Sequence, residues 1–367
     1  MDLEFSDEQK QLKEQVTRLL DEKATPDSLR KLITAEAGFD RDLWKQAAEL
    51  GLLGAAIPEA YGGVGLGAKD LCVIAEEMGR TVAPIPFFSS ICLAAEAIKL
   101  AGTEAQKSAW LPKLASGETI GTLAWNEGPG AASLSVTTRI ADGRVDGVKS
   151  PVADAEIADL LVVVCAGPRL VLVETAQPGV RMEPLRGFDQ LRKHAKVTLA
   201  DASAEEMTGA NADETLRRLY DAAAVYEAFE QVGAAEAAML MARDYTLQRY
   251  IFGRQLASYQ AVKHNLANIL VMVELARSNA LHAAVALEAD SPDLASAAAT
   301  ARIGATKAYE VAARENLQLH GGIGFTWEAN CHFHYRRARL LALNLGSVEV
   351  WEGKLIDALT ARNATAA

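Results

Sequence analysis

The chain reads RYIFGRQLASYQAVKH from Arg249 to His264 and QLHGGIGF from Gln318 to Phe325. The first stretch places two arginines around a Phe-Gly pair, with a glutamine eight residues beyond the phenylalanine. The second places paired glycines directly after Gln-Leu-His. A guanidinium presents a fixed fork of donors that suits a diphosphate, and glycine lets a backbone approach a ligand closely. Both stretches therefore predict contact with a ligand.

Helical patterns surround both stretches. We expect a long helix that begins at a cap formed by Asn211 or Asp213 and runs to about Gln248. Further helices are predicted over residues 259–290, 294–319 and 348–362. Alanine is frequent here, and small residues let helices cross closely, as in a four-helix bundle. Residues 211–367 are therefore predicted to be a C-terminal helix bundle that carries the ligand-contacting segments.

The segment that precedes this bundle has the composition of a β domain. Short β-prone runs cover residues 122–125, 158–164, 170–174 and 195–199. They are separated by turn sequences such as Asp142-Gly143, and this pattern is typical of antiparallel strands. Residues 121–210 are therefore predicted to form a small antiparallel β domain.

Residues 1–120 are predicted to be helical. Ser6 with Gln9 three residues later is a capping box, and helices are expected over residues 40–50, 71–79, 89–101 and 104–114, with a break at Pro112. The glycine-rich segment 58–70 resembles the start of a dinucleotide fingerprint, but no βαβ unit surrounds it, so a loop is predicted. The fold class is thus α+β, with the order helices, β domain, helix bundle.

Composition limits the classes of function. The 367 residues carry a net charge of −11, which argues against nucleic-acid binding. The four cysteines lie far apart without a CxxC pair, so disulfides and zinc are not expected and a reducing cytoplasm fits. The N-terminus lacks the pattern of a signal peptide, and no uncharged apolar run of about 18 residues predicts a membrane span.

With these motifs in place, the chain resembles the acyl-CoA dehydrogenase family. The resemblance rests on the domain order, the loop PEAYGG at residues 58–63 and the two stretches RxxFG…Q and QxxGGxG. It implies an FAD bound between subunits, an acyl-CoA thioester as substrate and an electron-transfer flavoprotein as electron acceptor. In that family a glutamate base removes the α-proton while the flavin accepts the β-hydride.

The family's cross-subunit cofactor contacts have counterparts in this chain. Carried over residue by residue, the resemblance implies FAD contacts by the following side chains and backbones: Arg249, Phe252, Gln260, Gln318, Gly321, Gly322, Ser347 and Glu349. The same residues could instead be loop and helix-end residues that serve packing.

The catalytic positions depart from the family pattern. Leu345 stands where a glutamate precedes Gly-Thr in active members, and Ala223 stands where other members carry the base on the long helix. Ala224 replaces the arginine usual beside that second position. In the β domain, the run Leu123–Gly128 replaces Tyr-x-Val-Thr-Glu-Pro, and Pro151–Ala153 replaces the Trp-x-Thr turn. No catalytic residue is therefore predicted in this chain.

Three functions remain open on these grounds. The leading one is a subunit without a base that lends FAD contacts to a related, base-bearing subunit, as in bacterial heterotetramers of steroid side-chain degradation. The second is an active homo-oligomer with a relocated base at Glu227 or Glu349, each one helical turn beyond a lost base position. Both carboxylates could equally be solvated helix residues. The third is a flavin-free scaffold that reuses the fold.

One further pattern could suggest a metal site. Cys331-His332-Phe333-His334 places three potential ligands on one short segment, but no additional ligands lie nearby in sequence. Packing is the preferred interpretation, and no metal is predicted. The remaining histidines are scattered and indicate no catalytic triad.

Overall fold

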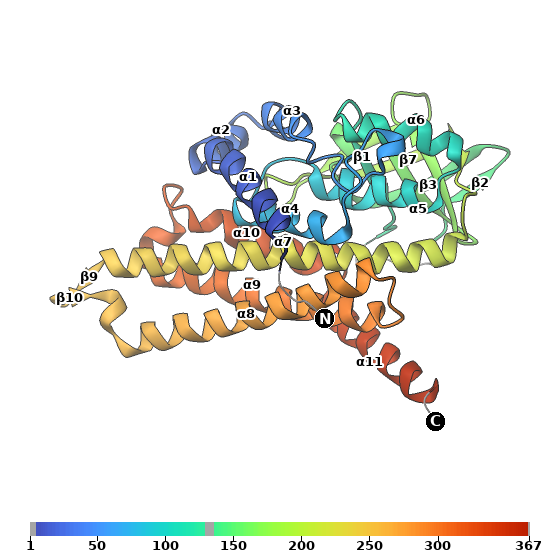
Figure 1. Cartoon of the computed structure of the whole chain (residues 1–367). Helices are drawn as coiled ribbons and strands as arrows, with labels where there is room; N and C mark the ends of the chain where they lie inside the picture. The colour runs from blue at the N-terminus through green and yellow to red at the C-terminus, as the bar shows by residue number, and fades with distance from the viewer. Residues whose placement is uncertain (1–4, 129–135, 366–367) are drawn as a thin grey trace. The chain divides into compact units, whose positions relative to one another are not determined.

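A computed structural model describes residues 5–128 and 136–365 (Figure 1). The chain forms two compact units, each built from segments that are discontinuous in sequence. We call Met1–Pro26, Cys72–Ala83 and Ala224–Ala367 the bundle unit. We call Asp27–Leu71 and Pro84–Ala223 the sheet unit. The three contiguous domains expected from sequence, 1–120, 121–210 and 211–367, remain a prediction.

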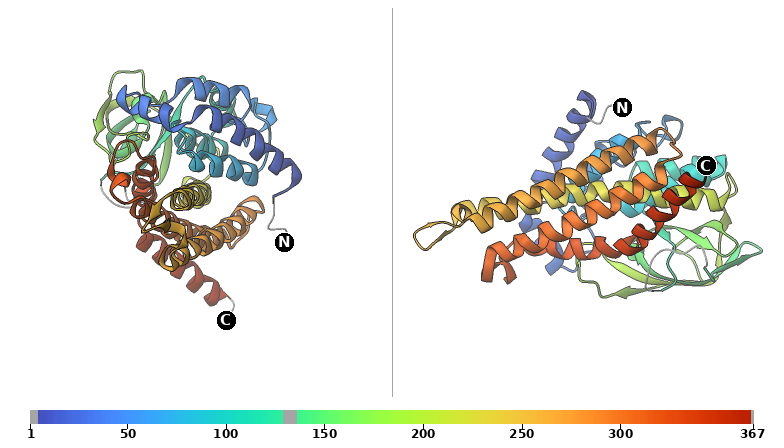
Figure 2. Two further views of the ribbon diagram at one scale, coloured as in Figure 1. Left: turned by 90° about the vertical axis from the view of Figure 1, so that its left-hand side faces the viewer. Right: turned by 90° about the horizontal axis from the view of Figure 1, so that it is seen from below.

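Long helices running side by side make up most of the bundle unit (Figure 2). They are α7 (Ala212–Gln248), whose first turns belong to the sheet unit, α8 (Gln260–Glu288), α9 (Leu294–His320), α10 (Cys331–Asn344) and α11 (Val348–Thr365). The Asn211 side chain caps α7 by accepting the backbone N–H groups of Asp213 and Glu214 at 3.0 and 3.2 Å. Of the two caps proposed from sequence, Asn211 is therefore the one used.

Two further helices, α1 (Asp7–Lys23) and most of α4 (Ala68–Arg80), complete this unit. The capping box of Ser6 and Gln9 begins α1 as predicted. Glycines let α4 approach α7 closely, because a Cβ at Gly233 would lie 2.0 Å from the Glu76 carbonyl oxygen and one at Gly79 would lie 1.8 Å from that of Glu230. These distances fall far inside van der Waals contact, so glycine is required at both positions.

Two four-stranded sheets form the centre of the sheet unit. One has the order β1 (Gly121–Ala124), β4 (Leu160–Cys165), β5 (Arg169–Glu174), β8 (Glu205–Glu206). The other has the order β2 (Arg139–Ala141), β3 (Arg144–Ala153), β7 (His194–Ser203), β6 (Val180–Leu185). The pairings in these two sheets are antiparallel except that of β1 with β4, which is parallel. Every residue of β4 is buried, so this strand lies within the hydrophobic core of the sheet unit.

Short helices pack around these sheets. They are α2 (Pro26–Thr34), α3 (Arg41–Glu49), η1 (Glu59–Tyr61), η2 (Phe88–Ala95, wound as a π-helix), α5 (Glu96–Ala101), α6 (Glu104–Ala115) and η3 (Ala155–Ile157). The segment around Gly63 is a loop, as predicted. The predicted break at Pro112 is wrong, because α6 continues three residues beyond it. Ser108, whose carbonyl would have bonded the missing N–H, is exposed, so water can satisfy it.

The α+β fold class is confirmed: the chain has an N-terminal helical part, a β domain and a C-terminal helical part. Within the described ranges, α8 alone has the length and apolar composition to cross a membrane. This observation is weak, because core helices of bundles pass the same test.

Candidate functional site

The stretch Arg249–His264, the first of the two that predict ligand contact, forms one end of the bundle unit. After α7 the chain makes a small hairpin of β9 (Tyr250–Ile251) and β10 (Arg254–Gln255), which projects from the bundle end (Figure 1). Phe252 at its turn has φ +51° and is 94% exposed. Both the left-handed backbone of Phe252 and the exposure of its ring are unfavourable within this chain alone. The Leu256 amide donates to the Arg249 carbonyl at 2.7 Å and closes the hairpin.

The second stretch lies at the same end. Helix α9 ends at His320, and the glycines follow in η5 (Gly321–Phe325). The His320 ring stacks on Tyr245 of α7, with centroids 4.1 Å apart and 21° between the planes. The Asn265 amide of α8 donates to Glu315 of α9 at 2.6 Å. The structure thus brings together the two stretches, which we call the tip (residues 245–260 and 318–325).

Sequence analysis missed Tyr245 as a residue of the tip. It lies four residues before Arg249, whose backbone N–H donates to the Tyr245 carbonyl at 2.9 Å. Its ring holds His320 beside the end of α7, and the His320 Nδ1 is hydrogen-bonded to the Asn316 carbonyl at 2.7 Å. An aromatic residue one helical turn before the key arginine was the signal available in the sequence.

The tip has the properties of an anion-binding surface. Arg249, Gln260 and Gln318 are exposed, and no side-chain hydrogen bond or ion pair engages them within residues 5–128 and 136–365. Helix α8 begins there without a side-chain cap, so its first N–H groups face outward with the positive end of the helix dipole. No aspartate or glutamate occurs from Tyr245 to Val273, in a chain of net charge −11.

The glycines of the tip leave room for a ligand. A Cβ built on Gly321 or Gly322 meets nothing within 4 Å. Gly321 also has φ +64°, which favours glycine, whereas Gly322 is not in that region. Among the described residues no packing constraint therefore accounts for glycine at position 322, and the space beside its backbone is open.

Ser347 and Glu349 lie apart from the other six predicted contacts. The 14-residue α10 separates them from the tip, a span of about 20 Å at 1.5 Å per residue. The Ser347 hydroxyl and the backbone N–H of Glu349 lower the pKa of the Glu349 carboxyl, which sits in the first turn of α11. Glu349 therefore acts as a helix N-terminal carboxylate.

Apolar, buried residues occupy the two positions at which the family resemblance predicts a base. Leu345 at the end of α10 is 8% exposed, and its carbonyl accepts the Trp351 indole N–H at 2.9 Å. Ala223 and Ala224 on α7 are buried as well. None of these side chains can accept a proton.

Glu227, one of the two candidate relocated bases, is fully buried. Its carboxylate pairs with Arg302 at 3.1 Å and accepts the Asn344 amide at 3.1 Å. Arg302 also donates to Gln231 at 2.6 Å, to Thr306 and to the Leu341 carbonyl. The interpretation of Glu227 as a solvated carboxylate is therefore wrong, because partners far apart in sequence enclose it.

A second buried ion pair lies one turn further along α7, where Glu230 meets Arg337 at 3.1 Å. Together these side chains form what we call the charged core: Glu227, Glu230, Gln231, Arg302, Thr306, Arg337 and Asn344. Within this cluster Glu227 is engaged by the Arg302 guanidinium and the Asn344 amide.

In the sheet unit, the run Leu123–Gly128 is organised by its own carboxylate. Glu127 accepts hydrogen bonds from the backbone and hydroxyl groups of Thr137 and Thr138, at 2.6 to 2.9 Å, and from the Lys149 ammonium at 2.8 Å. Burial raises the pKa of Glu127, but these donors outweigh it and hold that pKa far below its usual range. Ala153 offers only backbone groups where the family has a threonine, and its carbonyl is already bound by the Thr122 hydroxyl at 2.7 Å.

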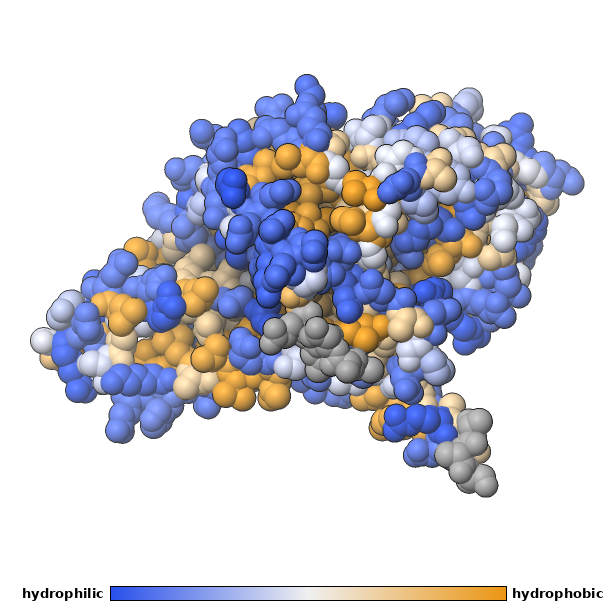
Figure 3. Space-filling model, in the orientation of Figure 1, coloured by the Kyte–Doolittle hydropathy of each residue, from blue (hydrophilic) through white to orange (hydrophobic). Residues whose placement is uncertain are grey.

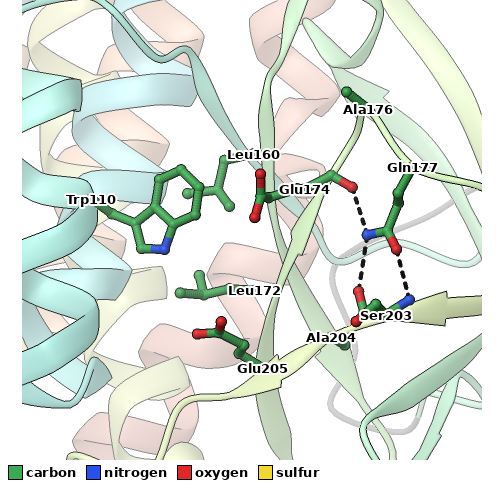
Figure 4. A pocket seen from close by; sticks show the side chains of 9 residues that line it. All are labelled: Trp110, Leu160, Leu172, Glu174, Ala176, Gln177, Ser203, Ala204 and Glu205. Atoms are coloured by element: carbon green, nitrogen blue, oxygen red, sulfur yellow. Dashed lines mark hydrogen bonds between the residues drawn. The ribbon is translucent and has the colours of Figure 1, made fainter.

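A cavity of about 240 Å³ opens in the sheet unit between α6 and strands β5 and β8. Trp110, Leu160 and Leu172 form its apolar wall, and Figure 4 shows Gln177 bridging the Glu174 carbonyl and the Ser203 backbone at 2.8 to 3.0 Å. None of the residues predicted to contact FAD lines it. The cavity is therefore separate from the tip.

The Cys331–His334 segment begins α10 and is buried. The Cys331 thiol donates to the Gly324 carbonyl at 3.3 Å, and burial raises its pKa. His332 stacks on Trp327, and His334 is hydrogen-bonded to the Tyr309 hydroxyl at 3.2 Å. These contacts support the packing interpretation and hold η5 against the helices.

Comparison with known proteins agrees with this architecture. The family profile "Acyl-CoA dehydrogenase, N-terminal domain" matches residues 6–118, and "Acyl-CoA dehydrogenase, C-terminal domain" matches residues 211–359. The chain is 30% identical over 359 residues to acyl-CoA dehydrogenase IpdE2 of Mycobacterium tuberculosis, covering 94% of this chain and 98% of that protein.

Two solved structures extend the comparison. A chain of a variant of the "Tcur3481-Tcur3483 steroid ACAD" superposes with a TM-score of 0.89 at 30% identity, over 98% of this chain and 99% of that one. A chain of the ChsE4-ChsE5 complex from Mycobacterium tuberculosis does so with a TM-score of 0.89 at 26% identity, with the same coverage. The chain belongs to the acyl-CoA dehydrogenase family, whose members are FAD-dependent oxidoreductases that act on CH–CH bonds.

Proposed function

We propose that this chain is the subunit of a heteromeric acyl-CoA dehydrogenase that lends FAD contacts to a related, base-bearing subunit. The observation that carries the proposal is a contrast within the bundle unit. The residues of the tip that are predicted to bind the cofactor, Arg249, Gln260 and Gln318, are exposed and unengaged, whereas both predicted base positions hold buried apolar side chains. When bound, the flavin supplies the hydride acceptor for α,β-dehydrogenation of the thioester.

Different residues of the tip would contact different parts of the FAD dinucleotide. Arg249 suits the diphosphate, and the uncapped N-terminus of α8 adds backbone donors beside it. Gln260 and Gln318 supply amide donors and acceptors, while Gly321 and Gly322 admit the cofactor to the backbone. Phe252 offers an exposed ring for apolar contact.

The chain's own catalytic positions support a lending role. Leu345 and Ala223 cannot remove a proton, and Glu227 is committed to Arg302 and Asn344. The base must therefore come from the partner subunit, together with the surface that holds the flavin ring. In this arrangement each pair of unlike subunits has one working site.

The relatives suggest a class of substrate and partner. One similar structure is described as a steroid acyl-CoA dehydrogenase of two named components, and another as a complex of two named chains. We extend this to the present chain as an acyl-CoA substrate of the steroid side-chain class and a second acyl-CoA dehydrogenase subunit as partner. An electron-transfer flavoprotein as acceptor and a cytoplasmic location complete the proposal.

The test is expression of the chain alone and together with a related subunit that retains its glutamate before Gly-Thr. We expect the lone chain to purify with little flavin absorbance and no dehydrogenase activity. The co-purified complex should contain about one FAD per pair of unlike subunits and should oxidise a steroid side-chain CoA thioester. Stoichiometric flavin and turnover from the lone chain would overturn the proposal.

A further inference from the structure

The cavity of about 240 Å³ in the sheet unit contains none of the residues predicted to contact FAD, and its lining has a chemistry of its own. Its floor and one wall are apolar, formed by Leu160, Leu172 and the Trp110 indole. Among the described residues that line it, Glu174 and Glu205 alone are charged. A cavity that offers negative charge beside apolar surface suits a ligand with a cationic group and an apolar body.

Strand pairing places both carboxylates of this cavity on one face of the sheet. Leu160 of β4 lies opposite Glu174 of β5. Leu172 of β5 lies opposite Glu205 of β8. Opposite residues of paired strands share a face, and so do residues two apart in one strand. All four side chains therefore lie on the face that packs toward α6, and Figure 4 shows both carboxylates extending toward the side of Trp110.

The protein supplies no counter-charge to these two carboxylates. Within residues 5–128 and 136–365, neither the Glu174 nor the Glu205 side chain makes a hydrogen bond or an ion pair. The adjacent Glu206, by contrast, pairs with Arg169 at 2.5 Å. Glu174 and Glu205 are diagonal neighbours across β5 and β8, so their Cβ atoms are about 7–8 Å apart. A cation between them would be attracted to both.

One wall of the cavity is fixed by the Gln177 amide. Its Nε2 donates to the Glu174 and Ser203 carbonyls at 2.8 and 3.0 Å, and its Oε1 accepts the Ser203 N–H at 2.8 Å. These bonds join the turn after β5 to the end of β7. The cavity is therefore formed before a ligand arrives, and binding need not order this wall.

The opposite wall, the Trp110 indole, is compatible with a cation. The Lys113 ammonium lies 5.1 Å from the centroid of this ring, within the range of a cation–π contact. Lys113 itself is not among the residues that line the cavity. The indole therefore provides an apolar surface for the body of a ligand and an attractive surface for its charge.

The size of the cavity favours a small molecule over a docked protein. A cavity of about 150 Å³ accepts a molecule the size of benzene, so this one accepts a ligand of roughly ten non-hydrogen atoms. On the face seen in Figure 3, the surface is mixed in hydropathy over the region where α6 and β3 are labelled in Figure 1. A protein-docking surface is typically a broader apolar patch.

We propose that this cavity binds a small primary alkylammonium ion, whose charge lies between Glu174 and Glu205. Its alkyl chain lies against Leu160, Leu172 and Trp110. The site lies within the sheet unit and uses no residue of the tip. It therefore holds whether or not the tip lends FAD contacts.

Calorimetric titration of the full-length chain with hexylammonium chloride tests the proposal, since such an amine is protonated at neutral pH. The matched neutral probe is 1-hexanol. We expect hexylammonium to bind about 10- to 100-fold more tightly than 1-hexanol, because hydrogen bonds to charged groups are lost in the alcohol. Equal affinities for the two probes would overturn the proposal.

Charge variants locate the bound ammonium. Glu174→Gln/Glu205→Gln should lower the affinity for hexylammonium to that for 1-hexanol. Glu49→Gln/Glu118→Gln is the matched control, because it removes the same charge at exposed positions of the sheet unit outside the cavity. Equal losses in the two variants would show attraction to net charge only and would overturn the proposal. Thermal denaturation without probe checks that both variants fold.

Two further variants and one further probe test the remaining alternatives. Trp110→Leu should weaken hexylammonium binding by about 3- to 10-fold through loss of the indole. Lys113→Gln should leave it unchanged, and a 10-fold gain would identify Lys113 as the chain's own occupant and overturn the proposal. A lysine-containing tripeptide should bind more weakly than hexylammonium. If it bound as tightly, the ligand would be a side chain of a protein partner, and the proposal of a small-molecule site would be wrong.

Discussion

The tip and the charged core lie in the same helix bundle but use arginine in opposite ways. At the tip, Arg249 is exposed and engages no other side chain in the described parts of the chain. In the charged core, Arg302 is buried and surrounded by Glu227, Gln231, Thr306 and the Leu341 carbonyl. The fold therefore leaves the Arg249 guanidinium accessible to a ligand and uses the Arg302 guanidinium for internal contacts. This difference supports the proposal that the chain keeps the FAD-contacting part of the family's site and lacks the base.

The charged core lies next to the two positions at which the family resemblance predicts a base. Glu227 lies one helical turn beyond Ala223, and its partner Asn344 directly precedes Leu345. The side chains next to both predicted base positions are thus hydrogen-bonded to each other, because the Asn344 amide donates to the Glu227 carboxylate. Buried ion pairs of this kind contribute specificity of packing more than net stability, but breaking one is costly.

The largest expected effect is on the charged core. Arg302→Met leaves the Glu227 carboxylate buried without its cation, and we expect a loss of about 3–5 kcal/mol in the free energy of unfolding. Urea denaturation monitored by circular dichroism measures this loss in the free energy of unfolding. The double variant Arg302→Met/Glu227→Met should recover most of that loss, because the unpaired charge is removed. Equal instability of the two variants would mean that packing, not charge, governs this region.

The buried histidine His334 makes stability depend on pH. Burial, with a smaller contribution from Arg337, lowers its pKa to about 4. The unfolded chain binds this proton near pH 6.5, so folding loses up to about 3 kcal/mol from this group as the pH falls from 7 to 4. Denaturation at several pH values should show a shallower decline for His334→Gln. If the free energy of unfolding falls equally with pH in the two proteins, His334 is not the source of the pH dependence.

At the tip the expected loss is in cofactor binding. Arg249→Ala should weaken FAD retention in the complex by about 1.5–3 kcal/mol, or roughly 10- to 100-fold, because a charged hydrogen bond to the diphosphate is lost. The stability of the lone chain should stay within about 0.5 kcal/mol. Arg243→Ala is the control, since Arg243 is exposed on the same helix and pairs with Asp244 at 2.7 Å. If both variants retain flavin equally well, the result would favour the interpretation of this chain as a scaffold that does not bind flavin.

A smaller effect is expected at Gly322. Because a Cβ there meets nothing within 4 Å, Gly322→Val should fold normally and bind FAD less tightly by about 1 kcal/mol through steric exclusion. Flavin titration of the complex and thermal denaturation of the lone chain measure the two properties separately. Gly353→Val on α11, where a Cβ is equally unobstructed, is the control. Reduced stability without reduced FAD binding would assign Gly322 to the fold.

The smallest effect is expected for the remaining candidate base. Glu349→Gln should leave turnover of the complex unchanged, because the Ser347 hydroxyl and the first turn of α11 lower the pKa of the Glu349 carboxyl and so make it a weaker base. A general base contributes about 100- to 10,000-fold to the rate, so a loss of that size would restore Glu349 as catalyst. Ser347→Ala should reproduce any small change, since the Ser347 hydroxyl is the main partner of that carboxylate.

Sequence reasoning succeeded where the signal is local. The capping box at Ser6, the cap at Asn211 and the loop around Gly63 each depend on residues within a few positions of one another. It missed α10, because the first four residues of that helix are all buried and leave no amphipathic pattern to detect. It also misjudged Glu227, whose partners lie 75 and 117 positions away.

The sequence by itself determined the family-like order of elements, the residues of the tip and the absence of a glutamate at positions 345 and 223. These properties follow from the identity of single residues and from short spacings in the sequence. Only the tertiary structure decided that Tyr245 joins the two stretches, that Ser347 and Glu349 lie a helix length away, and that Glu227 is enclosed. The physical reason is that ion pairs and ring contacts between helices depend on side chains distant in the chain. No local pattern encodes which of them will meet.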